Sequence, residues 1–282
     1  MENSFDYRKI KSLLSKAGIE DAGFEARLLI EKFYPELSSA EILAGGQNLN
    51  SAELSEAVKK RCERYPLQYI LGSWGFCKEN YFVTPDCLIP RAETELLVEL
   101  GAKLLPKHAR FIDLCTGSGC IAVSTLAKRS DVSAVAVDLF PRTLELASKN
   151  AEANGVLSRI EFKMCDVLSH CAGETVCGDE KFDAIFSNPP YIKSADIASL
   201  EPELANEPSA ALDGGADGLD FYRAIIGGFA PFLKDNGFFL FEAGADTARG
   251  VAGLGEAAGF CAEVVPDLAG LDRMILLTKN RI

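Results

Sequence analysis

Seven short apolar runs, separated by stretches with helical spacing, fill the last two thirds of this chain and limit it to one class of fold. We expect strands at residues 110–114, 134–137, 160–164, 184–187, 237–242, 262–265 and 274–278, with helices between them. This alternation is typical of parallel βαβ units, so it predicts an α/β protein with a seven-stranded, doubly wound sheet. Ligands of such sheets bind beyond the carboxyl ends of the strands, where the strand order reverses.

Residues 7 to 64 have the hydrophobic periodicity of helices, because their apolar residues recur at intervals of three and four. We expect four short helices, with breaks at Gly18, at Pro35, around Gly45-Gly46 and at Tyr65-Pro66, and with Ser51 as a helix N-cap. Two short apolar runs around a polar tip then predict a β-hairpin. The expected domains are a helical domain at 1–72, a hairpin linker at 73–90 and the α/β domain at 91–282. Packing against the larger domain and recognition of a macromolecular partner explain the helical domain equally well.

Charge and composition exclude several classes of function. A formal net charge of -12 disfavours a nucleic-acid partner, because binding to a phosphate backbone depends on lysine and arginine. No apolar run approaches the ~18 residues of a membrane span and the start lacks the pattern of a signal peptide, so we expect a cytoplasmic protein with no membrane partner. The nine cysteines form no C-x-x-C pair, and most of them are interpreted as small buried apolar residues. With only two histidines, we expect no metal site.

Three strand ends carry the features of an adenosine site. The first strand runs into a glycine-rich turn at residues 113–122, where Gly117 and Gly119 permit a tight turn and a close approach of the ligand to the backbone. Asp138 ends the next strand and is suited to accept hydrogen bonds from ribose hydroxyls. Asp166 follows the third strand, where it can accept a hydrogen bond from an adenine amino group. Nicotinamide and S-adenosylmethionine proteins share this arrangement, so the reaction stays open.

The tetrapeptide Asn188-Pro189-Pro190-Tyr191 follows the fourth strand and carries the candidate chemistry. Two prolines stiffen the segment and leave its carbonyls free to face a ligand. If the Asn188 side-chain oxygen and the Pro189 carbonyl each accept one N–H, a planar amide or amine nitrogen is oriented toward a sulfonium methyl group. Tyr191 can stack on the planar group. A dehydrogenase would instead need a His, Lys or Tyr proton donor near the cofactor, and the sequence offers none.

Together these motifs resemble a class I S-adenosylmethionine-dependent methyltransferase. The Asn-Pro-Pro-Tyr tetrapeptide is shared by enzymes that act on adenine, guanine and glutamine, so it does not choose among them. The linker region does: residues 66–72, Pro-Leu-Gln-Tyr-Ile-Leu-Gly, and 88–95, Leu-Ile-Pro-Arg-Ala-Glu-Thr-Glu, resemble the peptide chain release factor glutamine methyltransferases, the HemK/PrmC family. Further similar positions are Glu207-Pro208, Ala211-Leu212, Asp217-Gly218-Leu219, Tyr222 and Gly270-Leu271-Asp272-Arg273.

The resemblance implies a Rossmann-like methyltransferase domain that methylates the glutamine of the Gly-Gly-Gln loop of release factors on its side-chain nitrogen. S-adenosylmethionine would be the cofactor and S-adenosylhomocysteine the product, and the helical domain would help to hold the release factor. We expect a monomer. The implied cofactor contacts, by position, are Cys115, Thr116, Gly117, Ser118, Gly119, Asp138, Val167 and Asn188. The implied glutamine contacts are Asn188, Pro189, Pro190 and Tyr191, of which Asn188, Pro189 and Tyr191 are the expected catalytic residues.

Three positions depart from the family pattern. Cys115 stands where glycine is common, Val167 where an aromatic residue often packs on adenine, and Ala92 where proline is frequent. We interpret the first two as variation in cofactor affinity. Two alternatives stay open: an amino-group methyltransferase acting on adenine or guanine in nucleic acid, which the net acidity disfavours, and a non-catalytic module that binds a partner.

Overall fold

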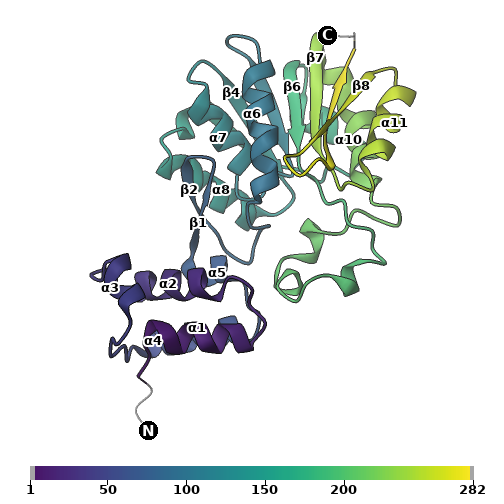
Figure 1. Ribbon diagram of the computed structural model, residues 1–282. Coiled ribbons are helices and arrows are strands. Elements are labelled where there is room, and N and C mark those ends of the chain that lie inside the picture. The colour runs from purple at the N-terminus through teal and green to yellow at the C-terminus, as the bar shows by residue number, and fades with distance from the viewer. Residues whose placement is uncertain (1–3, 280–282) are drawn as a thin grey trace. The chain divides into compact units, whose positions relative to one another are not determined.

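The computed structural model describes residues 4–279 and divides them between two compact units (Figure 1). One unit, here called the helical unit, contains the residues up to Ser73 together with the distant segment Glu201–Asn206. The other, here called the sheet unit, contains Trp74–Leu200 and the residues from Glu207 onward.

The helical unit contains the four helices expected from the sequence and one more. They are α1 Tyr7–Lys16, α2 Ala22–Phe33, α3 Ser39–Ala44 and α4 Ala52–Cys62, followed by α5 Leu67–Leu71 after Pro66. The predicted cap at Ser51 is confirmed, since its hydroxyl accepts a hydrogen bond from Leu54 N at 3.2 Å. The apolar stripes of these helices meet in a small core that contains Ile10, Leu14, Leu29, Ile30, Ile42 and Leu54.

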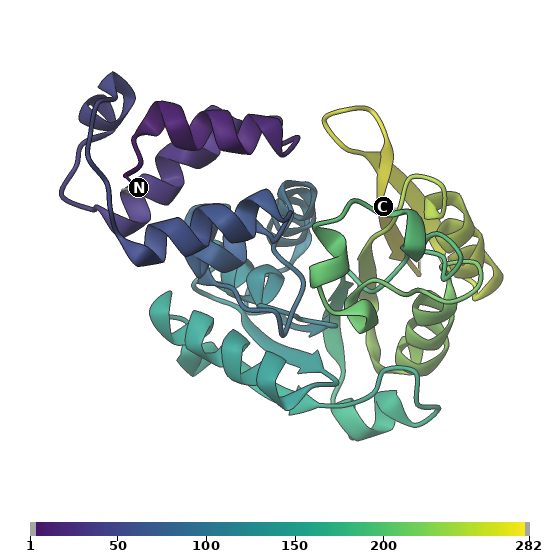
Figure 2. The same ribbon diagram turned by 90° about the horizontal axis from the view of Figure 1, so that it is seen from below.

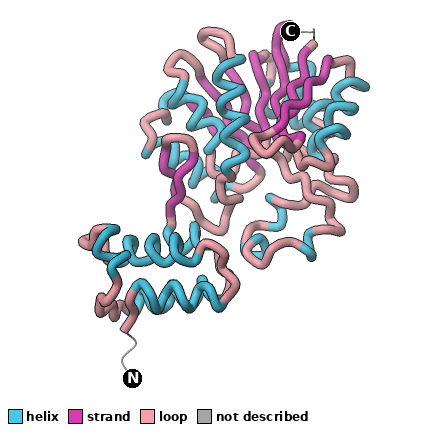
Figure 3. Tube along the Cα trace, in the orientation of Figure 1, coloured by secondary structure: helices cyan, strands magenta, loops and turns pink. Residues whose placement is uncertain are grey.

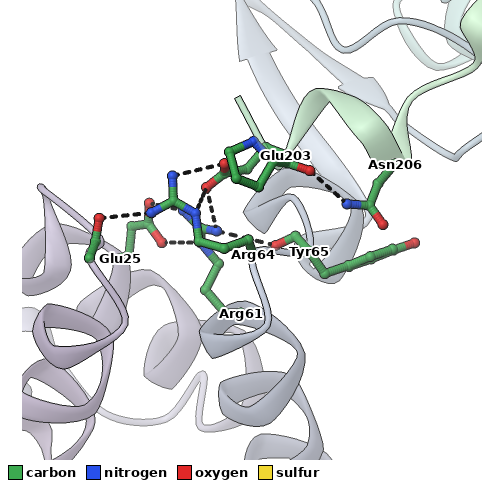
Figure 4. A network of polar contacts seen from close by, with 8 residues as sticks. Glu25, Arg61, Arg64, Tyr65, Glu203 and Asn206 are labelled. Atoms are coloured by element: carbon green, nitrogen blue, oxygen red, sulfur yellow. Dashed lines mark hydrogen bonds and ion pairs between the residues drawn. The ribbon is translucent and has the colours of Figure 1, made fainter. Parts of the chain in front are cut away.

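An ion-pair cluster attaches the segment Glu201–Asn206 to the helices of this unit (Figure 4). Arg61 is 5% exposed and bonds Glu25 through two nitrogens, at 2.6 and 3.1 Å. It also donates to Glu203 Oε1 at 2.9 Å, and Arg64 donates to Glu203 Oε2 at 2.9 Å. Burial raises the pKa of Glu203, but the hydrogen bonds from Arg61 and Arg64 outweigh this effect and the pKa is lowered. Both carboxylate oxygens of Glu203 are therefore paired with a cation.

A β-hairpin precedes the main sheet, as the sequence predicts, with strands β1 Ser73–Phe76 and β2 Glu79–Phe82 (Figure 3). Its second strand packs against helices of the sheet unit. The Asn150 side chain accepts from Phe82 N at 2.8 Å and donates to Phe82 O at 3.1 Å. Tyr81 is fully buried, with its hydroxyl 2.6 Å from that of Ser124.

The main sheet has the seven strands expected from the apolar runs, in the order β5-β4-β3-β6-β7-β9-β8. Their bounds are β3 Arg110–Leu114, β4 Ser133–Asp138, β5 Ile160–Met164, β6 Phe182–Ser187, β7 Leu233–Glu242, β8 Cys261–Pro266 and β9 Asp272–Thr278. The expectation of a helix between every pair of strands was wrong for the last pair. A tight turn joins β8 to β9, so β9 runs antiparallel to both neighbours.

Helices cover both faces of the sheet, which confirms the doubly wound architecture. One face is covered by α6 Glu95–Leu104, α7 Cys120–Lys128 and α8 Pro141–Ala153, and the other by α9 Ala172–Cys177, α10 Asp220–Phe229 and α11 Ala248–Ala257. Alternate residues of each strand enter one core or the other: Phe111 lies in the first and Ile112 in the second. Short 3-10 turns η1 Ala92–Thr94, η2 Leu157–Arg159, η3 Ile197–Ser199, η4 Leu204–Asn206, η5 Ser209–Ala211 and η6 Ala230–Phe232 complete the chain.

The strand order reverses between β3 and β6, because the chain adds β4 and β5 on one side of β3 and then returns to its other side. A crevice is expected there, beyond the carboxyl ends of the two strands. Figure 2 shows the molecule from the side of the loops that follow these strands. Among residues 4–279, no helix has both the length and the apolar character needed to cross a membrane.

Candidate active site

A cavity of about 430 Å³ opens at this switch point, within the sheet unit. Its volume falls in the range of small-molecule sites. Of the candidate cofactor and substrate residues named from the sequence, those that line it are Cys115, Thr116, Gly117, Ser118, Asp138, Asp166, Val167, Asn188 and Pro190. Gly119, Pro189 and Tyr191 are not among the lining residues. The fold therefore brings the candidate nucleotide residues and the tetrapeptide to one cavity.

The glycine-rich turn after β3 is held by a buried carboxylate, Asp113. Its Oδ2 accepts hydrogen bonds from Thr116 Oγ1 at 2.6 Å and from Ala122 N at 3.1 Å, which ties the turn to the first turn of α7. Gly117 and Gly119 adopt φ values of 54° and 81°, the left-handed region that favours glycine. Burial raises the pKa of Asp113 to about 7, and hydrogen bonding lowers it only in part. The turn leaves the backbone of 116–118 open to a ligand.

Cys115 has a strained backbone at this turn, with φ of 58°. A residue with a Cβ in this conformation costs roughly 1–2 kcal/mol relative to the right-handed region. The position at which the sequence departs from the glycine of the family is thus one where glycine fits without strain. Burial raises the pKa of the Cys115 thiol well above its usual range, so the group stays protonated and adds no charge to the cavity.

Asp138, at the end of β4, is fixed by two backbone donors. Its Oδ2 accepts from Gly117 N at 3.0 Å and its Oδ1 from Phe140 N at 3.2 Å. Burial raises the pKa of Asp138, and these hydrogen bonds oppose the shift. Each carboxylate oxygen has a further lone pair, so the side chain can still accept two hydrogen bonds from a ligand.

Apolar side chains that the sequence reasoning missed form the wall near Asp138 and Asp166. Leu139, Phe140 and Leu168 line the cavity and are 46%, 45% and 47% exposed. Their signal in the sequence is their place near an acid at or just after the end of a strand: Leu139 and Phe140 come directly after Asp138, and Leu168 comes two residues after Asp166. Val167 is buried and lines the same wall, whereas Asp166 is exposed and accepts from Leu168 N at 2.9 Å. Such a wall offers flat apolar surface to a planar ring.

Two sequence motifs that lie far apart in the chain meet at the rim of the cavity. Arg91, from the motif after the hairpin, forms an ion pair with the buried Glu207. Glu207 also accepts from Ile89 N at 3.0 Å. The ion pair holds residues 88–91, which line the cavity, next to Glu207. Glu207 is the residue at which the chain re-enters the sheet unit. Sequence reasoning singled out both motifs only by resemblance.

The tetrapeptide begins immediately after β6, which places Asn188 beside the turn of β3. Ser187 is fully buried and donates its hydroxyl to Leu114 O at 2.6 Å, so the ends of the two strands are joined. Asn188 Nδ2 donates to Thr94 Oγ1 at 3.1 Å. The carboxamide is thus anchored through its nitrogen, while the residue lines the cavity.

The segment around residues 212–218 packs directly against the tetrapeptide. Ile192 N donates to Leu212 O at 2.9 Å and Gly214 N donates to Ile192 O at 2.8 Å. A Cβ on Gly214 would lie 2.7 Å from Tyr191 Cα, and one on Gly218 would lie 2.4 Å from Tyr191 O. Both positions therefore require glycine. Gly214 was missed in the sequence, where its only signal is the Gly-Gly pair within a polar stretch.

Tyr191 is partly buried and packs against the core that contains α10 and α11. Burial and, to a smaller extent, the charge of the nearby Glu242 raise the pKa of Tyr191 to about 12. The phenol is therefore neutral near pH 7 and is not a base. Its part in contacting a substrate stays a prediction.

Glu242, the last residue of β7, is a buried acid that the sequence reasoning also missed. It is 1% exposed, and burial raises its pKa to about 7, although hydrogen bonds from Thr94 and Asn188 and the charge of Arg273 oppose this. Its Oε2 has no hydrogen-bond partner among the described residues. Within the same part of the chain, no cluster of three or more His, Cys, Asp or Glu residues is arranged to hold a metal ion.

Comparison with known proteins gives matches over nearly the whole chain. The family model "Methyltransferase small domain" matches residues 92–216, and the model "PrmC N-terminal domain" matches residues 7–72. The release factor glutamine methyltransferase of Geobacter sulfurreducens is 37% identical over 271 residues, which cover 94% of this chain and 92% of that protein. The enzyme of the same name from Cereibacter sphaeroides is 40% identical over 267 residues, covering 93% of each. A solved methyltransferase from Pyrococcus furiosus shares the fold, with a TM-score of 0.52 and 14% identity over 71% of this chain and 89% of that one.

Proposed function

The chain belongs to the release factor glutamine methyltransferases, and from this premise we propose that it transfers a methyl group from S-adenosylmethionine to the loop glutamine of a peptide chain release factor. The acceptor is the side-chain amide nitrogen of the glutamine in the Gly-Gly-Gln loop. The observation that carries the proposal is the anchored carboxamide of Asn188, which lines the same cavity as Asp138 and the turn of β3.

The residues around the cavity fit the cofactor. Asp138 retains one lone pair on each oxygen, which suits the two ribose hydroxyls. The left-handed Gly117 lets the cofactor approach the backbone of the turn, and Leu139, Phe140 and Leu168 offer apolar surface for the adenine ring. S-adenosylmethionine supplies a methyl group on a positively charged sulfur and leaves as a neutral thioether.

The tetrapeptide addresses the weakness of an amide nitrogen as a nucleophile, which is that its lone pair is delocalised into the carbonyl. In our proposal, Asn188 Oδ1 accepts one N–H of the glutamine and the Pro189 carbonyl accepts the other. These two acceptors orient the nitrogen toward the methyl group and stabilise the positive charge that develops on it. The chain at Gly214 and Gly218 packs closely against the backbone of Tyr191, and this packing keeps the two acceptors in place.

The reaction balances without a strong base. The bond between sulfur and the methyl carbon breaks as the bond between carbon and nitrogen forms, and the methylated nitrogen then loses one of its two protons. An amide that carries a positive charge on nitrogen is a strong acid, so water or a carbonyl takes this proton. Tyr191, neutral near pH 7, would contact the flat face of the glutamine amide.

We also propose that the helical unit takes part in recognising the release factor. The match of the PrmC N-terminal domain to residues 7–72 supports this role. The net charge of -12 favours a protein substrate over a nucleic acid.

The test is a transfer assay with labelled S-adenosylmethionine and a purified release factor, followed by mass spectrometry of the peptide that contains the Gly-Gly-Gln loop. We expect one methyl group on the loop glutamine. A release factor with alanine in place of that glutamine is the matched control and should stay unlabelled. Label on RNA or DNA would support the base methyltransferase instead, and the absence of cofactor binding in calorimetry would support a non-catalytic module.

A further inference from the structure

Glu242 occupies a position that its surroundings do not explain as structural. Ser187 pairs with Phe241 in the register of β6 and β7. The next residues, Asn188 and Glu242, therefore lie side by side at the carboxyl ends of these two strands. Glu242 is 1% exposed and its Oε2 has no partner among the described residues. A buried carboxylate without a full set of partners is costly, so its place beside Asn188 calls for a functional reason.

The hydrogen bonds around Glu242 determine which way the Asn188 carboxamide faces. Asn188 Nδ2 donates to Thr94 Oγ1, which leaves the Thr94 hydroxyl with its own proton to donate. Thr94 and Asn188 both interact with the Glu242 carboxyl as hydrogen-bonding groups that lower its pKa. A carboxylate accepts hydrogen bonds and donates none, so the nitrogen of the Asn188 amide must face Thr94 and Glu242. Its Oδ1 is then directed away from them.

We propose that Glu242 is a positioning residue, which acts through Thr94 and fixes the Asn188 carboxamide with Oδ1 toward the nitrogen that receives the methyl group. This inference rests on the proposed function, because it assigns Asn188 Oδ1 the task of accepting an N–H of the substrate. Thr94 is 2% exposed, so water does not replace it in this relay. Its place in η1, directly before α6, holds the hydroxyl in position.

The protonation of Glu242 controls this arrangement. A protonated carboxyl can donate to Asn188 Oδ1. The Asn188 carboxamide could then flip, so that its nitrogen would face the substrate. Burial raises the pKa of Glu242 to about 7. The charged and titratable groups that influence it or are influenced by it are Arg273 on β9, Glu93 in η1, Tyr191 after β6, Tyr222 on α10 and Cys120 on α7.

The experiment compares Glu242→Gln with the wild-type enzyme in the labelled transfer assay. Glutamine keeps the shape of the side chain but can donate a hydrogen bond to Asn188 Oδ1. We expect kcat to fall on the order of 10²-fold, because the acceptor is misdirected, while KM for the cofactor stays nearly unchanged. The wild-type kcat should decline as the pH falls through about 7, and the variant should lose this acid limb.

A second pair of variants tests the relay through Thr94, so the inference does not depend on one substitution. Thr94→Val removes the hydroxyl at nearly constant volume and should lower kcat, and Thr94→Ser should recover part of the loss. Asp183→Asn is the matched control, because Asp183 is an acid at the opposite, amino end of β6 that accepts from Arg110 N at 2.8 Å. Its kcat and pH profile should equal those of the wild type.

The outcomes separate this inference from the proposed function. Absence of transfer by the wild-type enzyme contradicts the proposed function itself. An active wild type together with a Glu242→Gln variant of equal kcat and equal pH profile overturns the positioning role. Melting temperature and calorimetric cofactor binding, measured for each variant, identify one that fails to fold, and the Thr94 pair then decides: equal kcat in Thr94→Val and the wild type also overturns the role.

Discussion

Glu203 in the helical unit, which is partly exposed, and Glu242 in the sheet unit, which is buried, are both acids in polar clusters, but their pairing and their pKa shifts are opposite. Both oxygens of Glu203 bond arginines, and its pKa is lowered. Glu242 has one oxygen without a partner among the described residues, and burial raises its pKa to about 7. The pairing of Glu203 accounts for its part in holding a segment in place, whereas the pairing of Glu242 leaves one oxygen unaccounted for beside Asn188, the residue that we propose binds the acceptor nitrogen.

Removal of the Arg61 guanidinium, which pairs with Glu203, should have the largest effect, and this effect is on the stability of the fold. Arg61→Met keeps the apolar stem but leaves Glu25 and Glu203 without their shared partner, and breaking a buried pair in this way costs about 3–5 kcal/mol. Chemical denaturation followed by circular dichroism measures the loss. Arg27→Met is the matched control, since the more exposed pair of Arg27 with Glu31 is worth about 0.5 kcal/mol or less. Equal losses in the two variants would contradict the buried cluster as an anchor.

Removing the side chain of Asn188, which lies beside Glu242, should lower activity strongly and leave the fold intact. Asn188→Ala deletes the oxygen that we assign to the substrate, and loss of one such group costs about 10²–10³-fold in kcat, or roughly 3–4 kcal/mol of transition-state stabilisation. Labelled transfer measures the rate, and calorimetry should find cofactor affinity close to that of the wild type. Retention of full activity by Asn188→Ala would remove the catalytic role of the tetrapeptide.

The two acids should also give opposite dependences of stability on pH. The folded protein binds a proton at Glu242 more readily than the unfolded chain does, so its contribution is lost as the pH rises from 4.5 toward about 7. Glu203, with a lowered pKa, contributes stability above its ordinary pKa of 4.5 that is lost as the pH falls through its folded value.

Glu242→Gln should therefore be more stable than the wild type at pH 8, by up to about 3 kcal/mol. Urea denaturation at pH 5 and pH 8 measures this difference, which should be small at the lower pH. If the variant is as stable as the wild type at pH 8, or less stable, then other groups offset the cost of burying the charged carboxyl of Glu242.

The smallest expected effect concerns the backbone strain at Cys115, in the turn after β3. Cys115→Gly and Cys115→Ala both remove the thiol, but only glycine adopts the φ of 58° without strain. The glycine variant should be the more stable of the two by about 1 kcal/mol, as measured by thermal denaturation. Calorimetric titration of both variants then tests whether the turn binds the cofactor more tightly with glycine. Equal stabilities would indicate that the strain is relieved elsewhere in the turn.

The sequence predicted the sheet well because its strands are continuous apolar runs, which is how a strand buried on both faces reads. It failed at the connection of β8 to β9, where the runs are separated by a turn too short for a helix. The cavity residues at strand ends were found because fold topology places them there. Thr94 was recognised only as part of a motif and was given no role, and Glu242 was missed as a site residue, because nothing in their spacing distinguishes them from other polar residues. Burial and pairing are what lead to the roles that we propose for them.

The attachment of Glu203 to the helical unit was likewise beyond sequence reasoning, since its partner Arg61 lies 142 residues earlier. This separation has a consequence for synthesis on the ribosome. At an elongation rate of roughly 5–20 residues per second, about 7 to 28 seconds pass between the emergence of Arg61 and that of Glu203. During this interval Glu25 is the one carboxylate of the described cluster that Arg61 can pair with, and the helical unit is complete only after three quarters of the chain has been made.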